Sequence, residues 1–207
     1  MRKSNSTVPR VRRFDPNRRA RIAEVALEVV AKWGVEGLTH RRVAAAAGVP
    51  LGSMTYHFSS SEDLLAVAIE LAVARNREFW HRWAQNLPST PDLAEELTRL
   101  LVDVFSSKER SRSIVQLELY LAAMRRPALR PASVAWGKVV FTTLAQYTDA
   151  GTARALSLML DSLAVESLVA GEPPSRNDSL AMFHRVLKVQ PSEISSPRAT
   201  LSRGQLK

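Results

Sequence analysis

The chain of 207 residues contains no cysteine, so disulfide bonds and thiolate metal sites are excluded. It has only four histidines, His40, His57, His81 and His184, and none has a convincing set of partners for catalysis or metal binding. No apolar run approaches the about 18 residues that span a bilayer, and the N-terminus lacks the apolar segment of a secretory signal. These absences argue against an enzyme, a metal or cofactor site and a membrane protein. They fit a cytoplasmic location.

What the sequence has in excess is positive charge, and that charge is unevenly distributed. Residues 1–61 hold eleven Lys/Arg against four Asp/Glu, which is +7 of the total net charge of +9. Attraction to nucleic-acid phosphates is the natural interpretation, with a solvated basic tail as the alternative. Residues 1–14 are expected to form a flexible basic arm. This arm either lies along phosphates or enters a minor groove, or it has no specific role.

Two short helices joined by a tight corner are predicted between Leu38 and Phe58. Thr39 is a natural N-cap, Gly48 suits the left-handed end of a helix, and Pro50 can begin the next helix. A helix–turn–helix of this size places its second helix in the major groove of DNA. The alternative is a corner in an ordinary helical bundle.

Candidate DNA contacts follow from this geometry. Helix N-termini attract anions, so Thr39 and Arg42 are expected to contact phosphate, as is Arg18 in an earlier helix. Gly52 would let the backbone approach DNA closely, and small or hydroxyl side chains can meet base edges or thymine methyl groups. The residues expected to face outward from the second helix are Pro50, Leu51, Ser53, Thr55, Tyr56 and His57. Met54 and Phe58 should pack inward.

The predicted fold is all-α, with about nine helices and no β pattern. The first helix is expected from Asp15 to about Trp33, with a buried stripe that includes Trp33. The later helices are expected at 62–85, 91–106 (capped by Thr90), 112–124, 131–148, 152–170 and 178–189. The sequence therefore divides into an arm at 1–14, a helix–turn–helix domain at 15–61, a second helical domain at 62–190 and a disordered tail at 191–207.

One part of the sequence resembles the DNA-binding domain of the TetR family of bacterial transcriptional regulators, over about residues 16–70. The resemblance is carried by Thr39, Val43-Ala44, Ala47-Gly48-Val49, Gly52, Tyr56-His57-Phe58 and Ser61-Glu62-Asp63-Leu64. It implies phosphate contacts by Tyr56 and His57, and a small-molecule effector in the second domain. It also implies a homodimer formed through the helices near 152–170 and 178–189. Members often have Lys where this chain has Ser61, which can cap the fourth helix but brings no charge.

Candidate effector contacts are aromatic, methionine and acidic residues of the second domain. A buried carboxylate is costly unless it is paired, so the acids either form structural ion pairs or hold a cationic aromatic ligand. The aromatic residues are equally well explained as core. The candidate set is Phe79, Trp83, Glu118, Tyr120, Met124, Trp136, Phe141 and Asp161, with Glu166 as a further acid.

These patterns lead to one main functional expectation. The protein is expected to be a ligand-responsive, homodimeric transcriptional repressor on the nucleoid. It would bind a palindromic double-stranded DNA operator and be released by a small hydrophobic effector. A cationic effector is one option. The alternative is a constitutive DNA-binding protein without an effector.

Overall fold

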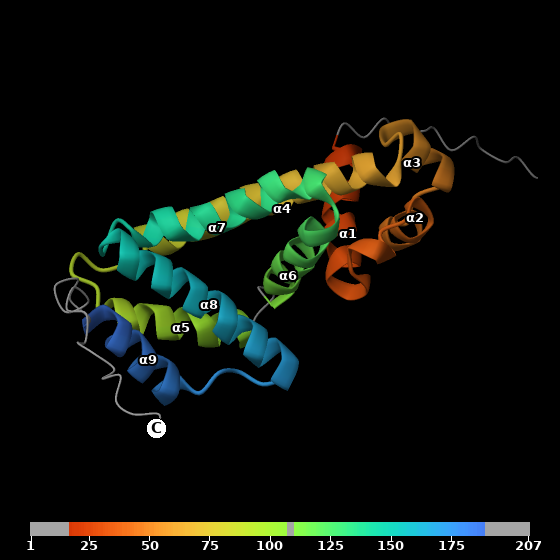
Figure 1. Cartoon of the computed structure of the whole chain (residues 1–207). Coiled ribbons are helices and arrows are strands. Elements are labelled where there is room, and N and C mark those ends of the chain that lie inside the picture. The colour runs from red at the N-terminus through yellow and green to blue at the C-terminus, as the bar shows by residue number, and fades with distance from the viewer. Residues whose placement is uncertain (1–16, 107–109, 189–207) are drawn as a thin grey trace, which may run out of the picture. The chain divides into compact units, whose positions relative to one another are not determined.

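The computed structural model describes residues 17–106 and 110–188, which form nine α-helices, two short 3₁₀ turns and no strand (Figure 1). The all-helical prediction is confirmed for this part of the chain. The predicted arm, the Asp15 helix start and the predicted disordered tail lie outside it. The described residues divide into an N-terminal unit that ends at Leu71 and a C-terminal unit that begins at Ala72. This boundary falls inside helix α4 (Ser61–Gln85), which contributes to both units.

The N-terminal unit consists of α1 (Arg18–Trp33), α2 (His40–Ala47), α3 (Leu51–His57) and the start of α4. Apolar residues at helical spacing on α1 face α2, and burying them provides the main driving force for folding this unit. Its fully buried side chains are Ile22, Ala26, Val43, Met54, Phe58, Leu64 and Ala68. Burial of Met54 and Phe58 agrees with the sequence prediction.

Trp33 departs from the predicted buried stripe of α1, because 53% of its surface is exposed. It lies on the last turn of the helix. The ammonium nitrogen of Lys32 lies 5.0 Å from the centre of its ring, and the guanidinium carbon of Arg42 lies 5.1 Å from it. A cation over the face of an indole ring is stabilised electrostatically by the ring quadrupole. A Cβ on Gly37 would lie 2.5 Å from the Cβ of Trp33, so only glycine fits there.

The C-terminal unit contains the rest of α4 with α5 (Leu93–Ser106), α6 (Arg110–Arg125), α7 (Arg130–Leu144), α8 (Ala150–Ala170) and α9 (Arg176–Lys188). Helices α5, α8 and α9 lie side by side (Figure 1). The core of this unit is formed mainly by Trp80, Leu97, Leu144, Leu156, Leu160 and Phe183.

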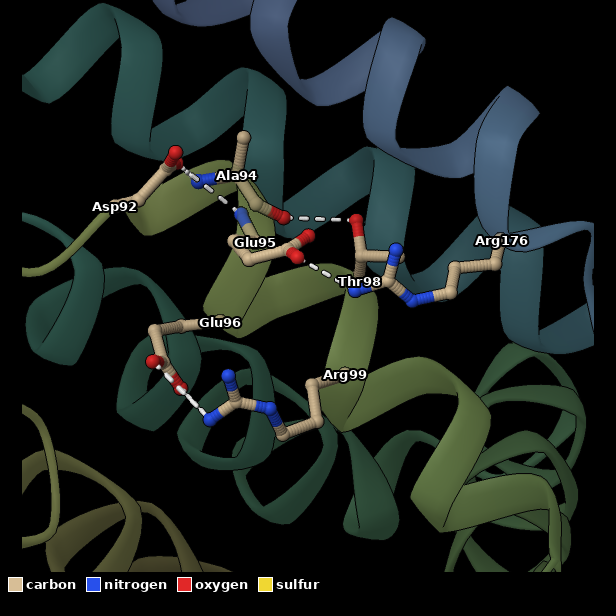
Figure 2. Close-up of polar contacts among 7 residues, drawn as sticks. All are labelled: Asp92, Ala94, Glu95, Glu96, Thr98, Arg99 and Arg176. Atoms are coloured by element: carbon tan, nitrogen blue, oxygen red, sulfur yellow. Dashed lines mark hydrogen bonds and ion pairs between the residues drawn. The ribbon is translucent and has the colours of Figure 1, made fainter.

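The start of α5 corrects the predicted cap. Asp92, not Thr90, caps the helix: its carboxylate accepts the backbone N–H groups of Ala94 at 3.1 Å and Glu95 at 3.2 Å (Figure 2). Because α5 begins at Leu93, a cap at Thr90 would stand too far upstream. Figure 2 also shows an ion pair between Glu95 and Arg176, which joins α5 to the first turn of α9.

None of the helices within residues 17–106 and 110–188 combines the length and the apolar character needed to cross a membrane.

Candidate DNA-binding surface and ligand groove

The corner between α2 and α3 has the geometry that its sequence predicts. The hydroxyl oxygen of Thr39 accepts the backbone N–H of Arg42 at 3.2 Å and so caps α2. Gly48 ends the helix in the left-handed conformation, at φ 63° and ψ 32°. The N–H of Val49 then bonds to the carbonyl of Ala44 at 3.0 Å, which closes the turn. Helix α3 begins directly after this corner, at Leu51.

The outer face of α3 is open to solvent. Tyr56 is 81% exposed and Leu51 is 50% exposed, and Gly52 and Thr55 lie on the same open side. A Cβ at Gly52 would meet no atom within 4 Å. Of the other expected contacts, Pro50 is exposed, while Ser53 and His57 are half-buried. The helix thus presents one turn of small and apolar groups, and the aromatic ring of Tyr56 stands at its end.

Two predicted phosphate contacts are more constrained than the sequence indicates. One guanidinium N–H of Arg42 donates to the carbonyl of Gly37, and the group lies over the ring of Trp33. Arginine carries five N–H donors, so a phosphate contact by Arg42 is compatible with this bond. Arg18 is half-buried, and its Nε has no hydrogen-bond partner within the described residues.

The entry to α4 uses residues that the sequence analysis missed. Ser60, not Ser61, caps this helix, because its hydroxyl oxygen accepts the N–H of Asp63 at 3.1 Å. The carboxylate of Asp63 accepts the N–H of Ser59 at 2.9 Å and pairs with Arg19 at 3.5 Å. The arrangement resembles a capping box, except that the carboxylate of Asp63 reaches Ser59 rather than the capping residue Ser60. The Ser-x-x-Asp spacing was the available signal, and it fixes α4 against the end of α3.

In the C-terminal unit, a groove with a volume of about 900 Å³ lies between α6, α7 and α8. Three predicted effector contacts, Tyr120, Phe141 and Asp161, line it together. The other lining residues are Ser133, Val134, Gly137, Lys138, Val140, Ala150, Gly151, Arg154, Ser157 and Leu158. Most of these are apolar or small, so the groove suits a hydrophobic molecule with a few polar anchor points.

Asp161 is the acidic group of the groove. Its carboxylate accepts the Nε2 hydrogen of Gln116 at 2.7 Å and the hydroxyl hydrogen of Tyr120 at 3.4 Å. Burial raises the pKa of Asp161 above its ordinary value, because the charged form loses hydration. The bonds from Gln116 and Tyr120 act in the opposite direction, as do the charges of Arg154 and Arg112.

Tyr120 is the neutral partner of that carboxylate. Burial and the charge of Asp161 raise its pKa to about 12, so the phenol keeps its proton at physiological pH. The phenol oxygen also accepts from Gln116 at 3.2 Å. Gln116, Tyr120 and Asp161 therefore form one hydrogen-bonded group on the wall of the groove, and sequence reasoning had not singled out Gln116.

The remaining predicted effector contacts do not line this groove. Trp136 is fully buried, and Phe79 and Trp83 pack against the core of the C-terminal unit. Met124 is exposed and Glu118 is half-buried. Glu166 is exposed too.

The capped α2, the tight corner and the solvent-exposed face of α3 are the features of a helix–turn–helix DNA-binding protein. Comparison with known proteins identifies its family. Residues 22–68 match the profile of bacterial regulatory proteins of the tetR family, and residues 88–189 match the tetracyclin repressor-like C-terminal domain. The chain belongs to the TetR family of transcriptional regulators, and it is not an enzyme.

Individual relatives support this assignment. A TetR-family member from Streptomyces coelicolor is 39% identical, with a TM-score of 0.71 over 84% of this chain and 100% of the other. The multidrug binding protein EbrR, solved with imidazole, is 38% identical, with a TM-score of 0.70 over 86% and 99%. The transcriptional regulator PksA of Bacillus subtilis is 41% identical over 54 residues, and the match spans about a quarter (26%) of either chain.

Proposed function

We propose that this TetR-family regulator is a homodimeric repressor that binds a palindromic operator and is released by a small hydrophobic cation. The effector class is inferred from the position of Asp161, a largely buried carboxylate on the wall of an apolar groove. Its hydrogen-bond donors within the described residues, Gln116 and Tyr120, are both neutral. An aromatic cation would neutralise the carboxylate and stack on apolar walls.

The relatives support this ligand class. EbrR, which is 38–39% identical to this chain, has been solved with proflavin, with malachite green and with ethidium. These three dyes are aromatic cations. Two basic residues, Lys138 and Arg154, also line the groove here, but both are exposed. Water and salt screen their charges far more than they screen a charge at Asp161.

The proposed dimer interface lies on α8 and α9. Leu158, Val165 and Val169 are exposed apolar residues at a spacing that places them on one face of α8. Met182 adds an exposed apolar side chain on α9. A second copy of the chain would cover this stripe, and pairing would supply the two-fold symmetry that a palindromic site requires. Leu158 also lines the groove, so the partner would border the effector site.

The proposed DNA contacts combine α3 with the N-terminus of α2. Leu51, Ser53 and Thr55 would meet base edges, and Thr39, Arg42, Tyr56 and His57 would meet phosphates. Helix α3 carries no Arg, Lys, Asn or Gln, so its direct reading of bases is limited to small contacts. DNA shape should therefore contribute much of the sequence preference.

The test begins with the selection of duplexes from a random library by the full chain. Operator affinity is then measured at several salt concentrations. A steep loss of affinity with salt and a palindromic selected sequence are expected. No preference over random duplex at moderate salt would contradict operator binding.

The effector class is tested by thermal shift of the full chain without DNA. Ethidium and tetraphenylphosphonium, both permanent cations, should stabilise the protein, because a ligand that binds only the native state raises its stability. Fluorescein, an anionic aromatic compound, should not. Stabilisation by fluorescein alone would contradict a cationic effector, and a lack of response to any ligand would favour a constitutive DNA-binding protein.

A further inference from the structure

A second, smaller cavity lies behind the wall of the groove. Its volume is about 40 Å³, and its lining includes Trp80, Arg112, Gln116 and Asp161. Asp161 therefore borders both spaces, the groove and this smaller cavity. Arg112 lines the smaller cavity together with Asp161 but does not line the groove, from which an effector would approach.

Arg112 contacts two residues of α4, Asn76 and Phe79. Its Nη1 donates to the side-chain oxygen of Asn76 at 3.0 Å, and its guanidinium carbon lies 3.8 Å from the ring centre of Phe79. Asn76 is fully buried, and its amide nitrogen donates to the carbonyl of Trp136 on α7 at 3.4 Å. One arginine of α6 thus joins the acidic group of the groove to the helix that continues into the N-terminal unit.

The charges of Arg154, which is exposed, and of Arg112, which lines the smaller cavity, both stabilise the ionised form of Asp161. A cation in the groove would stabilise the same ionised form, and it would also repel Arg112. The two cations therefore compete for one carboxylate. Binding of the effector would weaken the electrostatic attraction between Asp161 and Arg112, and the change would reach α4 through the contacts of Arg112 with Asn76 and Phe79.

We propose that Arg112 is a positioning residue that acts as the internal counter-ion of Asp161. It sets the affinity for a cationic effector and couples occupancy of the groove to α4. This inference rests on the proposed function, because it assumes a cationic effector at Asp161. Arginine suits the role because its planar guanidinium can stack on Phe79 and keep a directed bond to Asn76, which a lysine ammonium cannot do together.

The experiment compares three variants of the full chain with the wild type. Arg112→Met removes the charge at similar volume, and Arg112→Lys keeps the charge but loses the stack and the directed bond. Arg99→Met is the matched control, because Arg99 is exposed on α5 and, among the described residues, forms its ion pair with Glu96 on the same helix. Circular dichroism and melting temperature verify folding.

Two quantities are measured for each protein with tetraphenylphosphonium, which does not intercalate into DNA. The first is its affinity for the protein, by calorimetry. The second is the ratio of operator dissociation constants with saturating cation and without it. Arg112→Met should bind the cation about 3- to 10-fold more tightly and yet show at least about a fivefold smaller release ratio. Arg112→Lys should keep near wild-type affinity and lose release, and Arg99→Met should change neither quantity.

A purely structural role for Arg112 would weaken binding and release together. Unchanged or weaker cation affinity in Arg112→Met would therefore overturn the inference, as would an unchanged release ratio in either Arg112 variant. If Arg112→Met does not fold, the inference is tested with Arg112→Lys alone. That variant must keep its affinity for the cation and lose the release from operator DNA. A wild-type protein that binds no tetraphenylphosphonium would instead overturn the proposed effector class.

Discussion

At the scale of single residues, Gly52 and Asp161 each have a physical property that their neighbours lack. Gly52 leaves open space on the outer face of α3, where any larger group would stand between the backbone and a duplex. Asp161 places a carboxylate on an apolar wall. Each can be changed with little effect on packing, so each gives a test of function that is separate from folding.

Gly52→Ala should separate DNA binding from stability. A Cβ at this position meets no protein atom, and alanine favours a helix over glycine by up to about 1 kcal/mol. The free energy of unfolding in urea should therefore stay the same or rise. Operator affinity should fall about tenfold or more, because the methyl group would stand where the backbone approaches DNA. An undiminished affinity by fluorescence anisotropy would contradict the proposed approach of α3.

The affinity for ethidium, which is permanently charged, should rise with pH. Burial raises the pKa of Asp161, so its carboxyl group ionises at a higher pH than an ordinary carboxyl does. The affinity should increase as Asp161 ionises and level off once its ionisation is complete. Tyr120, with a pKa of about 12, keeps its proton throughout this range. A flat profile from pH 4 to about 8 would contradict binding at Asp161.

Asp161→Asn is the matched variant for this profile. A carboxyl group whose pKa is raised in the folded state supports stability fully only below its unfolded pKa. That support is lost as the pH rises through the folded pKa. The variant should therefore bind ethidium weakly at every pH. It should melt at a higher temperature than the wild type near neutrality, by about 2 °C, and show no such gain near pH 4.

At the scale of elements, the helices could be predicted more reliably than their ends. Apolar spacing and the breaks at proline and glycine located all nine α-helices, because these signals are local. The caps were harder. At α5 and α4, Thr90 and Ser61 were expected to cap, whereas Asp92 and Ser60 do so. Several adjacent residues can cap, and packing of the helix decides which of them stands at its first turn.

Ser60→Ala tests the corrected cap. Loss of the bond from the N–H of Asp63 should lower the free energy of unfolding by about 1 kcal/mol. Ser61→Ala is the control on the next residue and should lower it by less than about 0.3 kcal/mol. Urea unfolding followed by circular dichroism measures both. A larger loss at Ser61 than at Ser60 would place the cap where the sequence first suggested it.

The candidate site could be predicted only in part. Asp161 stood out because an acid in an apolar helix is costly, and Tyr120 and Phe141 lie in the same groove. Sequence spacing could not show that Trp136 turns into the core or that Gln116 reaches Asp161 from another helix. Such pairs depend on the packing of α6, α7 and α8 against one another, which no local pattern contains.

At the scale of the whole molecule, the account requires two copies of the chain. Val165→Glu places a charge in the exposed apolar stripe of α8 without disturbing the buried core. It should shift the protein from dimer to monomer in sedimentation velocity and reduce operator affinity by about tenfold or more, because one half-site remains. Glu166→Gln, on an exposed neighbour, is the control. A wild-type monomer, or an unaltered dimer in Val165→Glu, would contradict the proposed interface.

A cation held by Asp161 is proposed to release the protein from DNA. The direct measurement is the fluorescence anisotropy of a labelled operator duplex bound to the full chain, during titration with tetraphenylphosphonium. Operator affinity should fall at least about fivefold for the wild type, while Asp161→Asn should stay bound at the same cation concentrations. Equal release of both proteins, or no release of a wild type that binds the cation, would contradict this proposal.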